Sequence, residues 1–210
     1  MRGYPHGVAG RVLWDVDTQF DFISPDGKLY VPGAEEALPA MARLVGAARR
    51  AGIPHVASAD DHELSDPEIS AEPDFVSLWP PHCLRGTPGA MRPPETQQVD
   101  PVVLGESDVD PSWLQGLEFL LLKKAYDPFT NPNADRLLEL LDPQEIVLFG
   151  VATDVCNDAA IRGLLARGRA VSFVEDASRG LDEARTAACV TAWREGGVRF
   201  VTTAEVLDAL

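Results

Sequence analysis

The chain has 210 residues and a formal net charge of −15, from 18 Lys and Arg against 33 Asp and Glu. Such an acidic surface disfavours nucleic acid and anionic membranes as partners. No apolar run approaches the roughly 18 residues of a membrane span, and the N-terminal MRGYPHGVAG lacks the apolar segment of a signal peptide, so we expect a cytoplasmic protein.

Short apolar runs that alternate with helix-like segments predict an α/β fold. The six runs are Val12 to Val16, His55 to Ser58, Phe119 to Leu122, Ile146 to Phe149, Val171 to Val174 and Arg199 to Thr202. The helix-like segments are Leu38 to Ala48, Ala134 to Leu141, Val155 to Ala166 and Asp182 to Arg194. This rhythm is typical of parallel strands covered on both faces. We therefore predict a single three-layer α/β/α domain over residues 1–210, with a six-stranded, mostly parallel Rossmann-like sheet.

Residues 61 to 116 lack this alternation of apolar runs and helix-like segments. They contain nine of the 17 prolines and show no sustained period of either kind. Long irregular insertions in compact domains are usually functional or disordered. Because this one contains Trp79, His82 and Cys83, we interpret it as an ordered loop that forms part of a site.

Polar residues follow several of the predicted strands. Asp17 comes after the first run, Asp60 and His62 after the second, Lys123 after the third, and Cys156 shortly after the fourth. In an open parallel sheet, ligands bind outside the carboxyl ends of the strands. We therefore expect these five side chains to converge on one crevice.

Cys156 is a candidate nucleophile, since the start of a helix favours a thiolate over a thiol. Asp17 would be costly to bury without a partner, and a nearby Lys123 would supply one. Each residue also has a plainer explanation: Cys156 as a small packed residue, Asp17 as a turn residue and Lys123 as a solvated charge.

A metal site is the second candidate. Asp60 and His62 are spaced i, i+2, so both point to the same side of an extended segment, and His82 returns from the long loop. Three oxygen and nitrogen ligands with an open position suit a catalytic divalent ion. The alternative is that the histidines only satisfy loop hydrogen bonds.

Six motifs in order extend these observations: VLWDVDTQFDF, LYVPGA, SADDH, WPPHCLRGTPGA, KKAYDPF and GVATDVC. Together they resemble the isochorismatase-like cysteine hydrolases, and within them the nicotinamidases and pyrazinamidases, over most of the chain. The resemblance implies that Asp17 is the general base, Lys123 its charge partner and Cys156 the attacking thiolate. It also implies a cis peptide between Val151 and Ala152, with the N–H groups of Ala152 and Cys156 forming an oxyanion hole.

The resemblance further implies that Asp60, His62 and His82 bind a divalent metal ion, with Zn²⁺ expected and Fe²⁺ or Mn²⁺ as alternatives. Glu68 stands where many nicotinamidases have another histidine ligand, so we include it in the predicted metal set. Asn157, after the nucleophile, and Lys124, beside Lys123, also depart from the usual pattern.

We expect Phe22, Trp79 and Val151 to contact a flat aromatic substrate, with core packing as the alternative for the two aromatic residues. The implied activity is hydrolysis of nicotinamide to nicotinate and ammonia through a thioester. The alternatives are another small carboxamide or N-carbamoyl substrate, isochorismatase activity, and a non-catalytic binding module. The expected partners are a small amide and, in a homo-oligomer, other copies of the chain.

Overall fold

The computed structural model describes residues 10–109 and 116–210. The prediction that the N-terminus lacks a signal peptide therefore falls mainly outside the described residues, as does the end of the predicted loop at residues 110–115. Within the described ranges, no helix is both long and apolar enough to cross a membrane.

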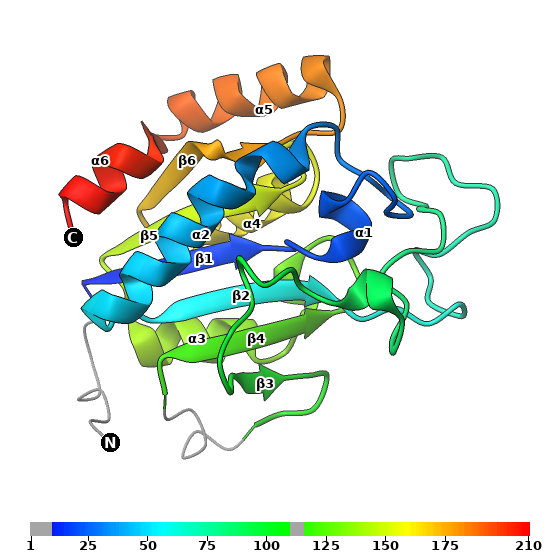
Figure 1. Cartoon of the computed structure of the whole chain (residues 1–210), viewed down its shortest axis with the longest axis horizontal. Coiled ribbons are helices and arrows are strands. Elements are labelled where there is room, and N and C mark those ends of the chain that lie inside the picture. The colour runs from blue at the N-terminus through cyan, green and yellow to red at the C-terminus, as the bar shows by residue number, and fades with distance from the viewer. Residues whose placement is uncertain (1–9, 110–115) are drawn as a thin grey trace.

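Seven parallel strands form one sheet in the order β3-β4-β2-β1-β5-β6-β7 (Figure 1). They are β1 (Arg11–Val16), β2 (His55–Asp60), β3 (Val102–Leu104), β4 (Glu118–Lys123), β5 (Glu145–Val151), β6 (Val171–Arg179) and β7 (Arg199–Val201). The predicted α/β class is confirmed, and six strands coincide with the six apolar runs. The predicted number was one too low, because β3 is a three-residue edge strand inside the proline-rich segment.

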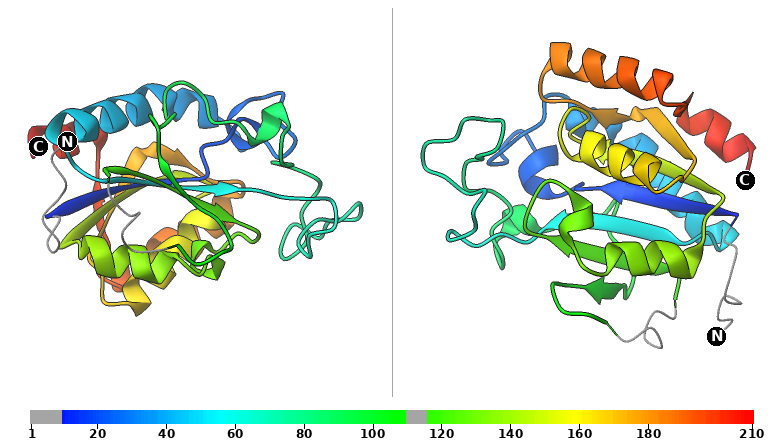
Figure 2. Two further views of the ribbon diagram at one scale, coloured as in Figure 1. Left: turned by 90° about the horizontal axis from the view of Figure 1, so that it is seen from below. Right: turned by 180° about the vertical axis from the view of Figure 1, so that it is seen from behind.

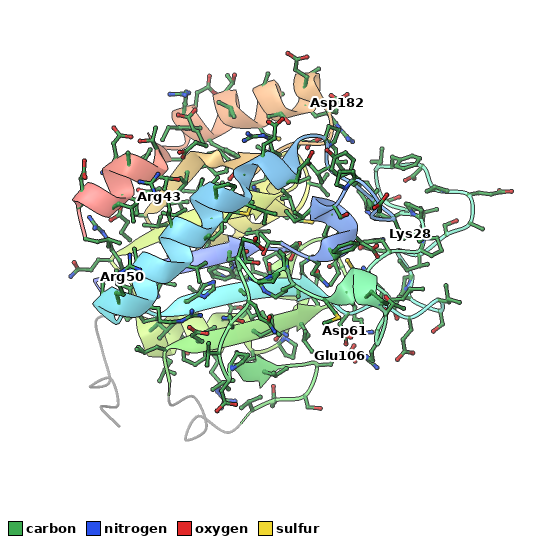
Figure 3. All side chains as sticks on the ribbon, in the orientation of Figure 1. Lys28, Arg43, Arg50, Asp61, Glu106 and Asp182 are labelled. Atoms are coloured by element: carbon green, nitrogen blue, oxygen red, sulfur yellow. The ribbon has the colours of Figure 1, made fainter. Side chains whose placement is uncertain are left out.

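Helices cover both faces of the sheet (Figure 2). They are α1 (Phe20–Ile23), α2 (Ala34–Ala51), α3 (Ala134–Leu141), α4 (Cys156–Ala166), α5 (Glu183–Glu195) and α6 (Thr203–Asp208). Because strand side chains alternate, β1 sends Val12 and Trp14 into the core beneath α3, α4 and α5, and Leu13 into the core beneath α2 and α6. Charged side chains such as Arg43 and Arg50 lie on the solvent side of α2 (Figure 3).

The order of the strands creates a crevice at the carboxyl ends. From β1 the chain adds β2, β3 and β4 on one side, and then crosses to add β5, β6 and β7 on the other. Consecutive connections therefore diverge at β1, which is the point where ligands bind in sheets of this kind. Asp17, Asp60 and Lys123 lie at the carboxyl ends of β1, β2 and β4, and Cys156 begins the helix after β5.

Gly150 allows β5 to approach the end of β1. Its φ is 128°, and an added Cβ would lie 2.1 Å from the main-chain oxygen of Val16. Any larger residue would push the two strands apart or force a strained backbone. The glycine therefore keeps the segment from Val151 to Cys156 next to Asp17.

A buried ion pair anchors the long loop that follows β2. Arg92 pairs with Asp15 of β1, and its guanidinium also donates to the main-chain oxygen of Thr96 at 2.9 Å. The Thr18 hydroxyl donates to the other Asp15 oxygen at 2.9 Å. Burial opposes ionisation of Asp15, but Arg92 and then His55 outweigh it and lower its pKa. The Asp15 carboxylate therefore has partners for both of its oxygens where the loop contacts the sheet.

We predict that Arg92→Met lowers the free energy of unfolding by about 3 kcal/mol, because it leaves the Asp15 carboxylate buried without its cation. Arg49→Met is the matched control: it removes an exposed pair with Glu118 and should cost less than about 1 kcal/mol. Urea unfolding at pH 7 measures both. Equal losses in the two variants would contradict the anchoring role of Arg92.

Candidate active site

The carboxyl ends of the central strands bring three reactive side chains together. The Lys123 ammonium lies 2.8 Å from Oδ2 of Asp17 and 4.0 Å from the Cys156 sulfur. All three residues are buried, and Cys156 retains 6% of its exposure. A carboxylate, an ammonium and a thiol therefore share one shielded volume, formed by the three residues that the sequence singled out.

The backbone at Asp17 directs its side chain into this volume. Asp17 has a φ of 51°, in the left-handed region that aspartate tolerates better than most residues. Its N–H donates to the main-chain oxygen of Ser58 at 3.2 Å, and its own oxygen accepts from the Gln19 N–H at 2.8 Å. The chain therefore turns out of β1 here, and the Asp17 carboxylate contacts the end of β4 across the crevice.

The two adjacent lysines point to opposite sides, as successive residues at a strand end should. Lys123 faces Asp17 and Cys156. Lys124 contacts the main-chain oxygen of Asp61, and its ammonium lies 3.2 Å from the Asp66 carboxylate. Lys123 is therefore the lysine that contributes to the site.

Two carboxylates compete for Lys123, which also pairs with Asp60. Burial opposes its charge, but Asp17 and Asp60 outweigh burial and raise the pKa of Lys123 well above its ordinary value. Burial raises the pKa of Asp17, and Lys123 only partly offsets it. The pKa of Asp60 is lowered well below its ordinary value, because Lys123 and the neighbouring histidines outweigh its burial. Asp17 is thus the carboxylate that more readily takes up a proton.

Cys156 lies in surroundings that oppose ionisation of its thiol. It is the first residue of α4, where the sequence predicted that the helix start would favour the thiolate. Burial instead raises the pKa of Cys156 well above its ordinary value; Lys123 lowers it, while Asp17 and Asp60 raise it further. Desolvation next to two carboxylates thus acts against the ionisation that a helix start favours. The sulfur therefore needs a base to remove its proton.

Asp60, His62 and His82 form a compact cluster beside Lys123. Their ligand atoms all lie within 4.8 Å of one another, and all three residues are buried. Oδ2 of Asp60 lies 3.7 Å from Nε2 of His62 and 3.3 Å from Nε2 of His82.

The other ring nitrogens are occupied. Nδ1 of His62 lies 3.2 Å from the Asp66 carboxylate, and Nδ1 of His82 lies 2.7 Å from the Pro80 main-chain oxygen. Both Nε2 atoms are thereby directed at one point, as outer partners direct histidine ligands in metal sites. Nε2 of His62 is buried without a hydrogen-bond partner among the described residues, which a divalent ion would supply. The cluster fits a divalent ion.

Glu68, the fourth predicted ligand, lies outside this cluster. Its two carboxylate oxygens both accept from the Tyr126 N–H at 3.1 Å. Burial raises its pKa, with the Tyr126 hydrogen bond acting in the opposite direction. Glu68 lines the same pocket as Asp60 and His82, so it faces the site without completing the ligand set.

A pocket with about 320 Å³ of empty space, part of it open to solvent, adjoins these groups. Its walls are mostly apolar and comprise Phe22, Leu29, Val31, Asp60, Glu68, Trp79, His82, Tyr126, Ala152, Val155, Cys156 and Leu181. Phe22 and Trp79 both line this pocket, and the Phe22 ring packs 5.2 Å from the His82 ring, centroid to centroid. Val151 is fully buried and absent from the pocket wall, where Ala152 and Val155 take its place.

The peptide bond between Val151 and Ala152 is cis, as predicted. Ala152 lines the pocket beside Cys156. Asn157, the polar residue after the candidate nucleophile, is buried and donates from its side chain to the main-chain oxygen of Gly150 at 3.0 Å. Its unusual polarity thus has a structural use at the β5–α4 junction.

Gln19 and Ser58 also belong to the site, although the sequence analysis did not select them. The Gln19 amide accepts from the Asp60 N–H and donates to the Asp60 main-chain oxygen, both at 2.7 Å. The Ser58 hydroxyl donates to Oδ1 of Asp17 at 2.7 Å. Their place next to selected residues, in WDVDTQ and SADDH, was the only available signal.

The sequence is similar to those of known hydrolases. Residues 12–205 match the family described as the isochorismatase domain. The nicotinamidase/pyrazinamidase of Mycobacterium tuberculosis is 30% identical over 200 residues, which cover 91% of this chain and 98% of that protein. The Escherichia coli nicotinamidase is 25% identical over 191 residues, covering 82% and 84%.

Solved structures show the same fold. The pyrazinamidase of Pyrococcus horikoshii in complex with zinc superimposes with a TM-score of 0.72 at 23% identity, covering 92% of this chain and 99% of that one. N-carbamoylsarcosine amidase from Thermoplasma acidophilum gives a TM-score of 0.72 at 24% identity, covering 92% and 96%.

The chain therefore belongs to the isochorismatase family of hydrolases. Within that family, its nicotinamidase relatives indicate an amidohydrolase, an enzyme that cleaves a carbon–nitrogen bond.

Replacing Lys123 should reveal the free-energy cost of burying the two carboxylates. In Lys123→Met, Asp17 and Asp60 lose their cation, so the already raised folded-state pKa of Asp17 should rise further and that of Asp60 should rise above its unfolded value. Each then costs stability as pH rises past the unfolded value, so the loss should exceed about 3 kcal/mol at pH 7.5 and be smaller at pH 5. Urea unfolding of metal-free protein at both pH values measures it.

Lys124→Met is the matched control and should lose about 1 kcal/mol or less, because its ammonium is partly solvated. A loss for Lys123→Met that is independent of pH would show that packing, rather than charge, accounts for its effect.

Proposed function

We propose that this protein is a metal-assisted cysteine amidohydrolase that converts nicotinamide to nicotinate and ammonia. The observation that carries the proposal is that Cys156 lines the same pocket as Asp60 and His82, while Lys123, paired with Asp17, lies 4.0 Å from the sulfur. The nicotinamidase relatives support the choice of amide.

In the first half of the reaction, Asp17 takes the proton of the Cys156 thiol and the thiolate adds to the carboxamide carbon. Lys123 keeps both groups ionisable by balancing their negative charge. The N–H groups of Ala152 and Cys156 are proposed to stabilise the resulting oxyanion. Asp17 then returns its proton to the leaving nitrogen, the carbon–nitrogen bond breaks, and ammonia departs from a thioester.

In the second half, Asp17 removes a proton from water as the water adds to the thioester carbonyl. The carbon–sulfur bond breaks, the sulfur recovers its proton, and the carboxylic acid is released. Apolar walls that include Phe22 and Trp79 suit a flat ring and exclude bulk water.

Asp60, His62 and His82 are proposed to hold a divalent ion, with Zn²⁺ the first choice. When bound, the ion would supply an electron-pair acceptor for the ring nitrogen, which helps to orient the carboxamide toward Cys156. An ion so placed would favour an amide with a basic ring nitrogen. It would have no purpose in isochorismate hydrolysis.

The domain organisation, the location, the oligomeric state and the alternative substrate are also proposals. We take residues 1–210 as one hydrolase domain that acts in the cytoplasm and forms a homo-oligomer. Another small carboxamide or an N-carbamoyl compound is the alternative substrate, and a screen of such amides for ammonia release distinguishes it from nicotinamide.

The catalytic proposal predicts that Cys156→Ala loses ammonia release from nicotinamide by at least about 10³-fold, since the covalent route is removed. Cys189→Ala, which removes another buried thiol on α5, serves as the control and should retain wild-type turnover. A coupled ammonia assay on purified protein measures both. Undiminished turnover in Cys156→Ala would overturn the mechanism.

The metal proposal predicts one bound Zn²⁺ per wild-type chain and its loss in His82→Ala, because two remaining ligands hold a divalent ion poorly. Elemental analysis after dialysis against zinc, followed by a chelator titration, gives the stoichiometry and the affinity. Glu68→Gln should keep the ion, since Glu68 bonds to the Tyr126 N–H. Loss of zinc in Glu68→Gln would make Glu68 a ligand, and retention in His82→Ala would exclude this site.

A further inference from the structure

We propose that Ser58 is a positioning residue that occupies one carboxylate oxygen of Asp17 and leaves the other to exchange protons with Cys156. The proposal rests on the proposed role of Asp17 as base. It assigns a task to a residue of β2 that lies outside the triad and outside the metal cluster.

Two hydrogen bonds join Ser58 to Asp17. The Ser58 hydroxyl donates to Oδ1 at 2.7 Å, and the Ser58 main-chain oxygen accepts from the Asp17 N–H at 3.2 Å. Ser58 is fully buried, so water cannot replace its hydroxyl as a donor. The serine therefore fixes both the backbone and the side chain of Asp17.

The two oxygens of Asp17 have different surroundings. Oδ1 is occupied by the Ser58 hydroxyl. Oδ2 lies 2.8 Å from the Lys123 ammonium, and among the described residues it has no hydrogen-bond partner of good geometry. A lone pair therefore remains on Oδ2 for the thiol proton, and the same Lys123 ammonium lies 4.0 Å from the Cys156 sulfur.

Fixing the carboxylate matters because Asp17 must serve two proton transfers at one place. It takes the thiol proton and then donates a proton to the leaving nitrogen on the same side of the pocket. Proton transfer is efficient only when donor and acceptor are within hydrogen-bond reach and aligned. A carboxylate held at Oδ1 cannot rotate away between these steps.

Two residues on the same side of β2 contact Asp17 and Lys123. Ser58 and Asp60 are separated by one residue, so their side chains point the same way from the strand. Ser58 donates to Asp17, and Asp60 pairs with Lys123. The end of β2 thus sets the spacing between the base and the ammonium.

The test compares three variants at this position. Ser58→Ala removes the hydroxyl, and Ser58→Thr and Ser58→Val form a pair of equal shape that differs only in the hydroxyl. We expect kcat for nicotinamide to fall about tenfold or more in Ser58→Ala, because the variant lacks the hydrogen bond that positions the charged Asp17 for proton transfer. KM should be almost unchanged, because Ser58 does not contact the substrate. The kcat of Ser58→Thr should exceed that of Ser58→Val by a similar factor.

A second readout does not depend on the substrate. Iodoacetamide alkylates the thiolate form of a cysteine, so its rate at Cys156, followed by peptide mass spectrometry, should fall in parallel with kcat. Ser172→Ala is the control: it removes a buried serine hydroxyl that donates to Glu145 on a neighbouring strand, away from the site, and should leave both rates unchanged.

The two readouts distinguish failure of the proposed Ser58 role from failure of the proposed substrate. Equal alkylation rates in Ser58→Thr and Ser58→Val would overturn the positioning role, even if nicotinamide is hydrolysed. A large difference in alkylation with nicotinamide inert would support the role of Ser58 while refuting the proposed substrate. Circular dichroism confirms that each variant is folded before its rates are compared.

Discussion

The ammonium of Lys123, buried among the carboxylates of Asp17 and Asp60, is the interaction on which this site depends. Two acidic groups and a thiol at the edge of a sheet would be prohibitively costly to bury without a cation. With Lys123 in place, Asp60 stays ionised and Asp17 becomes the weaker acid of the two. One cation therefore gives two carboxylates different acidities: Asp60 belongs to the candidate metal cluster, and Asp17 is the carboxylate that the proposed mechanism uses for proton transfer.

The sheet explains why these groups meet at all. Parallel strands end at the same edge, and the connections diverge at β1, so residues far apart in the chain line one crevice. The loop after β2 then supplies what the strands cannot: His82 for the metal cluster and Trp79 for the pocket wall. Its anchor is the buried Arg92–Asp15 pair, which lies beneath the loop on the α2 face. Stability of that pair and the shape of the pocket are therefore linked.

Most of the fold, and the convergence of Asp17, Lys123 and Cys156, could be predicted from the sequence, because apolar runs mark strands and the residues that follow them must lie at one edge. β3 could not be predicted, since three residues at an edge carry no period. The raised pKa of Cys156 could not be predicted either, because it depends on burial among groups distant in sequence. Ser58 was likewise hidden: a serine inside a predicted strand carries no chemical signal until its partner is known.

The central claim is that Cys156 carries the acyl group during turnover. The most direct measurement is mass spectrometry of the protein quenched in acid during steady-state hydrolysis of nicotinamide, followed by digestion to locate any adduct. The account predicts a nicotinoyl thioester on the Cys156 peptide, which disappears when substrate is exhausted. Continued ammonia release with Cys156 always unmodified, or with the acyl group on another residue, would contradict it.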